Sequence, residues 1–142
     1  MQQLSPKQKG DVSELRVLAK LAEAGVDIYL PYGEDNRSDV IIDTGDNLER
    51  VQIKTARSRS VKDTAIQFNC RSTRSNYTET ENEGYDGDVD AFIVYWPGDD
   101  EYYYVPIEEA PKTTMTLRRE VAENNQTDGI NFAEDYALSE QV

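Results

Sequence analysis

The sequence predicts one α/β (α+β) domain in which an N-terminal helix precedes a series of short strands. Two observations favour this fold class. Apolar residues recur at three- and four-residue intervals from Val12 to Ala22. After Gly25, short stretches rich in Val, Ile and Tyr alternate with turn residues. At 142 residues the chain is long enough for one substantial core but not for two. We therefore expect residues 1–142 to form a single domain, with 1–9 loosely ordered.

The helix is expected to begin at an Asp11 N-cap and to end at Gly25, which has the residue type preferred beyond a helix C-terminus. A polar turn rich in Asp, Asn and Gly then joins two of the predicted strands as a hairpin. The pattern predicts strands at 27–31, 39–42, 51–54, 65–70, 89–96 and 102–107, then a helical turn at 107–110. Residues 77–88 are predicted to form an acidic, glycine-rich loop, and 115–118 and 133–136 are left unassigned.

Residue types that are absent exclude several functions. The chain has no histidine, which excludes Ser-His-Asp and Cys-His catalysis and the common histidine-based zinc sites. The lone Cys70 forms no internal disulfide and no CxxC metal site. A metal ion would therefore bind oxygen ligands, as magnesium, manganese and calcium prefer. No apolar run is long enough for a membrane span and no signal-peptide pattern is present, so we expect a cytoplasmic protein.

The net charge is strongly negative, with 28 Asp and Glu against 15 Lys and Arg, or −13 at pH 7. The acidic residues are spread over most of the chain rather than gathered in a tail. Such a surface is typical of adaptation to high salt. A surface that mimics nucleic acid or recruits a basic partner is the sharper alternative.

Polar residues form a compact cluster on the predicted hairpin. Successive strand residues point to opposite faces, so Val51 and Ile53 face one way while Gln52 and Lys54 face the other. Asp39 opens the neighbouring strand. An acid beside a Gln-x-Lys pair is the best candidate for chemistry in this sequence. The alternative is a purely structural hairpin with a solvated amide and a solvated lysine.

Glu14 is an unusual residue within the apolar stripe of the helix. At 100° per residue it falls between the directions of Leu18 and Leu21, where most helices carry apolar side chains. One interpretation is a capping box, with Asp11 at the N-cap and Glu14 at N3. The other is a carboxylate that reaches from the helix into a polar site under the sheet. Position in the sequence leaves both open.

Together these residues make a site suited to phosphodiester hydrolysis. The carboxylates of Glu14 and Asp39, the amide oxygen of Gln52 and the backbone carbonyl of Ile53 are hard oxygen ligands for Mg²⁺ or Mn²⁺. Lys54 would position or deprotonate an attacking water and stabilise charge that develops on phosphorus. The sequence therefore predicts a metal-dependent site for phosphodiester hydrolysis.

These residues also carry a resemblance to a known family. The αβββ order with Glu14, Asp39, Gln52 and Lys54 resembles the PD-(D/E)XK nuclease superfamily, and more narrowly its group I intron-encoded homing endonuclease branch. The resemblance covers nearly the whole chain. The matching blocks are K-G-D-V-S-E-L (9–15), L-P-Y-G-E (30–34), S-D-V-I-I-D (38–43), V-Q-I-K-T (51–55), D-A-F-I-V-Y (90–95), Y-Y-V-P (103–106) and N-N-Q-x-x-G-I (124–130).

The resemblance implies a restriction-endonuclease-like core, with a mixed β-sheet and flanking helices. It implies that Glu14 and Asp39 bind the divalent metal and that Lys54 is the catalytic lysine. Two positions depart from the superfamily pattern: Ser38 stands in place of Pro, and Gln52 in place of the second-strand acid. The Gln lowers the negative charge of the metal site. Holliday-junction resolvases share the core, so a junction-cutting enzyme is an alternative, as is a non-cleaving DNA-binding module.

DNA is the expected partner, bound through basic residues that alternate with Ser and Thr in 55–75. The residues expected to contact it are Arg57, Arg59, Lys62, Arg71 and Arg74. Ordinary loop charge is the plain alternative for this set. Residues 102–104, three successive tyrosines, are expected to pack in a strand or interface rather than to stack on bases. One site per chain predicts a homodimer or homotetramer if both strands are cut. An acidic interaction protein with a structural hairpin is a third functional class.

Overall fold

The computed structural model describes residues 3–59, 63–71, 88–120 and 130–141. In chain order the helices and strands are α1 (Pro6–Glu23), β1 (Asp27–Tyr29), β2 (Val40–Asp43), β3 (Leu48–Thr55), β4 (Arg57–Ser58), β5 (Ala65–Asn69), β6 (Ala91–Trp96), β7 (Glu101–Pro106), η2 (Ile107–Glu109), β8 (Thr114–Arg118), η3 (Ala133–Tyr136) and α2 (Leu138–Gln141). Within these ranges no helix has the length and apolar character needed to cross a membrane.

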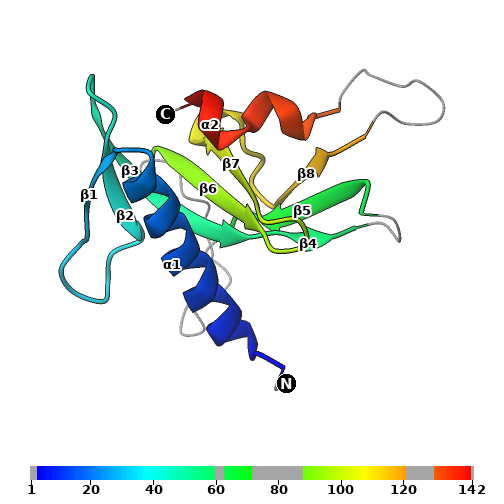
Figure 1. Ribbon diagram of the computed structural model, residues 1–142, viewed down its shortest axis with the longest axis horizontal. Helices are drawn as coiled ribbons and strands as arrows, with labels where there is room; N and C mark the ends of the chain where they lie inside the picture. Colours follow the sequence, from blue (N-terminus) through cyan, green and yellow to red (C-terminus); the bar gives the residue numbers. More distant parts are fainter. Residues whose placement is uncertain (1–2, 60–62, 72–87, 121–129, 142) are drawn as a thin grey trace.

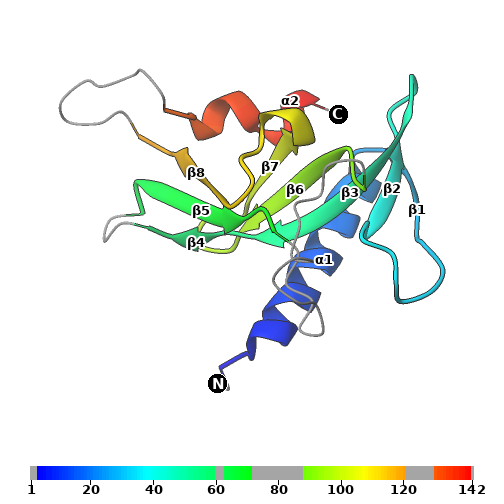
Figure 2. The ribbon, with the colours of Figure 1, turned by 180° about the vertical axis from the view of Figure 1, so that it is seen from behind.

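A mixed five-stranded sheet in the order β1-β2-β3-β6-β7 forms the centre of the molecule. Strands β3 and β6 are parallel, and every other neighbouring pair in this sheet is antiparallel. Helix α1 lies across one face of the sheet (Figure 1). A second, three-stranded antiparallel sheet has the order β4-β5-β8. It lies beside the C-terminal end of β3, which leads directly into β4, as the reverse view shows (Figure 2). This architecture confirms the predicted α/β class and mixed sheet.

The alternation of side chains along β6 divides the core in two. Ile93 and Tyr95 pack on the side of α1, in a cluster that includes Val17 and Leu21 of the helix. The intervening residues pack on the opposite side, with buried residues of β5 and β8. That second group is Phe92, Val94 and Trp96. Because all six β6 side chains are buried, β6 is the strand on which both layers are built.

The start of α1 differs from the prediction. Ser5, not Asp11, is the N-cap: its hydroxyl accepts from the Gln8 N–H, and the Gln8 side chain accepts from the Ser5 N–H. Pro6 occupies the first helical turn, where its missing N–H costs nothing. The expectation that residues 1–9 are loosely ordered is therefore wrong for 6–9. The reason is that Ser-Pro-x-Gln is itself a complete helix start, which carries the helix through Gly10.

The predicted strands are confirmed, with shifted ends. The hairpin of β2 and β3 forms as expected, although β3 begins already at Leu48, and β1 ends at Tyr29 before Pro31. The expected helical turn after β7 is η2. Strand β8, over the unassigned residues 115–118, pairs with β5, and short β4 was not predicted. Most of the predicted acidic loop 77–88 lies outside the described residues.

The three successive tyrosines serve packing, as expected. Tyr103 is buried, and its neighbours in β7 are half-buried. Their hydroxyl groups donate to acidic side chains: Tyr102 to Asp100, Tyr103 to Glu101 and Tyr104 to Glu49. Aromatic rings held in this way cover the sheet rather than offering flat faces to bases.

Candidate active site

Asp39 lies immediately before β2 and is held by two hydrogen bonds to β3. Its N–H donates to the Val51 carbonyl, at 2.8 Å, and its carboxylate Oδ2 accepts from the Ile53 N–H, also at 2.8 Å. The register that pairs Val40 with Val51 places Asp39 opposite Gln52. Residues directly opposite each other in a sheet share a face, so Asp39 lies on the face of Gln52.

The alternation predicted for β3 is confirmed. Val51 and Ile53 are buried in the cluster under α1, whereas Gln52 and Lys54 are half-buried on the other face. Asp39, Gln52 and Lys54 therefore project from neighbouring positions of the same hairpin. Only the pleat and the register of two strands are needed to bring them together.

Lys54 is not the freely solvated lysine of the structural-hairpin interpretation. Its ammonium Nζ donates to the carbonyl of Arg71 at 3.0 Å and lies 5.7 Å from the centre of the Phe92 ring. Burial lowers the pKa of Lys54 to about 8. The neighbouring Asp39 carboxylate opposes this shift, and the positive charge of Arg37 adds to it. A fraction of Lys54 is therefore neutral near pH 7.

Glu14 lies in the interior of α1, about two turns beyond the cap at Ser5. The capping interpretation is therefore wrong, because the Asp11 N-cap that it requires does not exist. Burial raises the pKa of Glu14, and the charges of Asp39 and Asp11 raise it further. The charge of Asp39 thus acts on Glu14, and a carboxylate directed into a polar site stays the prediction for this residue.

Burial also raises the pKa of Asp39, against the stabilising effects of the Ile53 N–H and of Lys54. A half-buried carboxylate whose charged form is disfavoured by burial is stabilised by a bound cation. Gln52 places an amide oxygen on the face of Asp39, whereas Glu14 belongs to α1, which packs on the opposite face. All three donors are of the hard oxygen type that Mg²⁺ and Mn²⁺ take. The residues present therefore fit a divalent ion.

Because position 52 is Gln rather than an acid, the candidate site has two carboxylates instead of three. Among the residues that the structure describes, no group of three or more His, Cys, Asp or Glu side chains is arranged to hold a metal. Two carboxylates and one amide fall short of that composition. With Gln52 in place of an acid, the candidate site therefore carries less negative charge than three acids would provide.

A hydroxyl pair that the sequence did not single out joins α1 to β3. Ser13 is only 2% exposed, and its Oγ lies 2.5 Å from Thr55 Oγ1 and donates to the Lys9 carbonyl at 3.0 Å. Ser13 precedes Glu14 and Thr55 follows Lys54, so this contact links the two backbones that carry site residues. In the sequence, Ser13 could have been recognised as a polar residue on the buried stripe of the helix, four positions before Val17.

Replacement of Ser13 by Ala is expected to reduce the free energy of unfolding by about 1–3 kcal/mol, because Thr55 loses its buried partner. Urea unfolding measures the loss. In the Ser13→Ala/Thr55→Val double variant neither hydroxyl remains, so the combined loss should be smaller than the sum of the single losses. Additive losses would mean that the two hydroxyl groups do not interact.

The predicted DNA contacts are only partly within the described structure. Arg57 lies in β4 and Arg59 just after it, and both are exposed. Arg59 Nη1 donates to Thr116 Oγ1 at 3.2 Å, across the three-stranded sheet. Arg71 is exposed at the end of β5, and its carbonyl is the group that accepts from Lys54. Lys62 and Arg74 lie outside the described residues.

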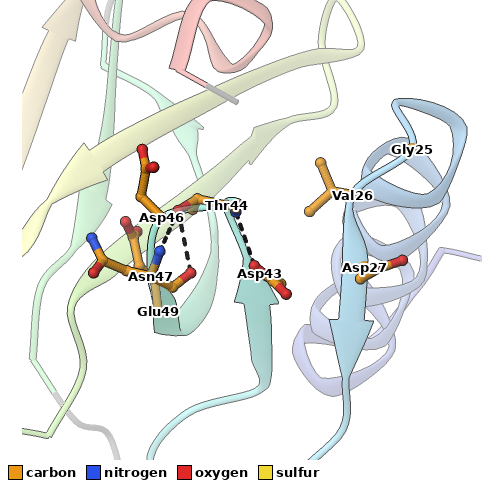
Figure 3. Close-up of a pocket in the computed structure, with 9 residues that line it drawn as sticks. Gly25, Val26, Asp27, Asp43, Thr44, Asp46, Asn47 and Glu49 are labelled. Carbon is orange, nitrogen blue, oxygen red and sulfur yellow. Dashed lines mark hydrogen bonds between the residues drawn. The ribbon is translucent and has the colours of Figure 1, made fainter.

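A cavity of about 580 Å³ lies at the opposite end of the hairpin (Figure 3). The β2–β3 turn and the segment after α1 surround it, with the side chains of Asp46 and Asn47 on one side and Val26 and Asp27 on the other. None of the residues predicted for the active site lines it. The turn around it is held by its own hydrogen bonds, including Gly45 N–H to Asp43 Oδ1 at 2.9 Å.

The mixed sheet, the helix across it and the polar hairpin define a protein of the restriction-endonuclease-like fold. The PD-(D/E)XK endonuclease family model matches residues 4–139, and the chain belongs to this family. A solved structure of a bacterial homing endonuclease, I-Ssp6803I, is similar with a TM-score of 0.75 at 19% identity, over 97% of this chain and 92% of the other. At that identity the likeness shows a shared fold. No curated protein matches the sequence.

Proposed function

We propose that the protein is a metal-dependent DNA endonuclease whose active site is centred on Asp39. The observation that carries the proposal is geometric: Asp39 lies opposite Gln52 and on the same face of the hairpin as Lys54, and its carboxylate accepts from the Ile53 N–H at 2.8 Å. In this site Glu14, Asp39, Gln52 and the backbone carbonyl of Ile53 bind Mg²⁺ or Mn²⁺. Family membership and the likeness to a homing endonuclease support a nuclease that acts on DNA.

Each side chain has a distinct part in the proposed reaction. Asp39 is oriented by the Ile53 N–H, so its carboxylate is already aligned when ligand and substrate arrive. Lys54, with a pKa of about 8, accepts a proton from the attacking water in its neutral form. As the water oxygen bonds to phosphorus, the P–O bond to the leaving oxygen breaks, and solvent water protonates that oxygen. The protonated amine stabilises the negative charge on the phosphoryl oxygens. The bound divalent ion supplies Lewis acidity at the phosphate.

Purified protein with supercoiled plasmid, linear duplex and a four-way junction tests this function directly. We expect Mg²⁺-dependent cleavage, measured at both low and molar salt because the chain carries a net charge of −13. Cleavage of the junction alone would assign the activity to a resolvase. Binding without cleavage of any substrate would assign the chain to the non-cleaving class, and cleavage that persists in Asp39→Ala or Lys54→Ala would indicate a contaminant.

One active site per chain has a consequence for assembly. Each site cuts one strand, so a double-strand break made in a single encounter requires a homodimer or a larger symmetric assembly. We therefore propose a homodimer or homotetramer as the active form. Light scattering of the protein alone and with DNA measures the assembly, and accumulation of nicked plasmid before linear product would indicate a monomer acting alone.

Gln52→Glu is expected to lower the Mg²⁺ concentration for half-maximal cleavage by about tenfold, the change that 1.4 kcal/mol of added attraction gives. The reason is that a third carboxylate joins Glu14 and Asp39 around the cation. In metal-free buffer the same change should lower Tm, because like charges then face each other. Gln52→Met, which removes the oxygen at similar length, should raise the Mg²⁺ requirement. Equal Mg²⁺ curves for all three proteins would exclude Gln52 as a ligand.

A further inference from the structure

Arg37 is a charged side chain that the sequence did not single out and that the proposed reaction does not yet use. It lies in the segment between β1 and β2, two residues before Asp39. Its side chain is only 16% exposed, and its Nη1 is 2.6 Å from Oδ2 of Asp88, just before β6. Arginine is seldom so buried unless an anion or hydrogen bonds compensate it.

The guanidinium of Arg37 belongs to the segment that leads into the candidate site. The N–H of Asp39, two residues after Arg37, donates to the Val51 carbonyl of β3. The positive charge of Arg37 is also a minor cause, after burial, of the lowered pKa of Lys54. Arg37 and Lys54 therefore give the part of the chain around Asp39 two positive charges. A phosphodiester at Lys54 would therefore place its charged oxygens within the field of Arg37.

We propose that Arg37 is a phosphate-binding residue of this active site and that Asp88 holds its guanidinium in place when DNA is absent. The inference rests on the proposed nuclease function. A guanidinium binds a phosphate through two parallel N–H donors, which a lysine cannot do. Asp88 is 43% exposed, so its carboxylate regains water readily when a phosphate replaces it as the partner of Arg37.

The test is the salt dependence of binding to a short duplex, measured in an Asp39→Asn background so that the DNA stays intact. Each phosphate contact adds about 0.9 to the slope of log affinity against log salt concentration. We expect Arg37→Gln to reduce the slope by about one and to weaken binding at low salt about tenfold. Asp88→Asn should keep the slope and bind at least as tightly as its parent, since a competing anion is gone.

A second ion pair in the same part of the fold provides a matched control. Arg50 Nη2 lies 3.3 Å from Asp90 Oδ1, and both side chains are largely exposed. Arg50→Gln and Asp90→Asn should leave the slope unchanged. In the Asp39-containing protein, Arg37→Lys should retain charge but reduce kcat, because the two-donor geometry is lost.

The alternative is that Arg37 and Asp88 form only a structural link between two loops. In that case Arg37→Gln and Asp88→Asn would lower Tm to the same extent and leave the salt slope unchanged, which would overturn the inference. Failure of the nuclease function itself gives a different result. The wild-type protein would then bind no DNA, or its cleavage would survive Asp39→Asn, whatever residue stands at 37.

Discussion

Asp39→Asn is expected to reduce DNA cleavage by at least about 10³-fold, the effect of losing several kcal/mol of transition-state stabilisation from a bound divalent ion. Asn retains an oxygen that accepts from the Ile53 N–H, so the hairpin should remain folded. The variant removes one of two carboxylates at the proposed cation site. Single-turnover cleavage of a labelled duplex measures the rate, and circular dichroism checks the fold.

Metal binding by the same variant is measured without DNA. A ligand present at a hundred times its Kd stabilises a protein by about 2.7 kcal/mol, roughly 5–10 °C of Tm for a domain of this size. We expect Mg²⁺ to raise the Tm of the wild-type protein in this way and to have little effect on Asp39→Asn. Asp43→Asn, at the other end of β2, is the matched control and should respond like wild type.

A parallel Tm series uses NaCl at the same ionic strength as the Mg²⁺ samples. This control is needed because any cation screens the repulsion within a chain whose net charge is −13. A stabilisation by Mg²⁺ that equals that by NaCl, or that survives Asp39→Asn unchanged, would contradict a specific site at Asp39.

The pH dependence of stability follows from the raised pKa values of Glu14 and Asp39. A carboxyl whose folded pKa is raised binds protons more tightly in the folded state. Its contribution to stability is full below the unfolded pKa, near 4, and is lost as pH rises through the folded pKa. In metal-free buffer, Tm of Asp39→Asn relative to wild type should therefore rise as pH increases from about 4. A constant difference across this window would indicate that the two carboxylates are solvated and independent.

Lys54→Met is expected to lower the cleavage rate by about 10²–10⁴-fold, the usual contribution of a positioned general base. DNA affinity should change little by comparison, because the lysine is only one of several cations near the site. Lys54→Arg should be nearly as inactive as Lys54→Met. An arginine stays protonated at all working pH values and cannot accept the proton of the attacking water.

The wild-type rate provides an independent check on Lys54. Its pKa of about 8 means that the neutral amine increases with pH up to that value, so the rate should rise and then level off above about pH 8. Lys20→Met, at the far end of α1 where the ammonium lies over Tyr102, is the matched control for loss of one positive charge. Substantial activity in Lys54→Arg would instead assign Lys54 to charge stabilisation alone.

Burial of Lys54 also affects stability, with the sign opposite to that of a paired lysine. Between about pH 8 and 10.5 the unfolded chain binds a proton that the folded protein has released, so stability rises with pH in that window. Lys54→Met removes this cost and should be more stable than wild type at neutral pH. Many active-site residues reduce stability in this way.

Local patterns predicted most of the secondary structure. The two-residue alternation in 51–54 placed Gln52 and Lys54 on one face, and Glu14 was recognised as an acid out of place on an apolar stripe. Helix capping was assigned to the wrong residue because two acceptable N-caps, Ser5 and Asp11, occur within one short segment. Strand β8 was missed because Met115-Thr-Leu-Arg carries little pattern of its own and becomes a strand by pairing with β5.

The sequence by itself predicted the class of chemistry. Its lack of histidine restricted any metal to oxygen ligands, and the hairpin register brought Asp39, Gln52 and Lys54 to one face. Tertiary structure showed that Glu14 does not cap the helix, and it revealed the contacts of Ser13, Thr55 and Arg37. These contacts join residues 42 or more positions apart, Ser13 with Thr55 and Arg37 with Asp88. Burial and proximity of charges, which set the pKa of Lys54, arise only when the layers pack together.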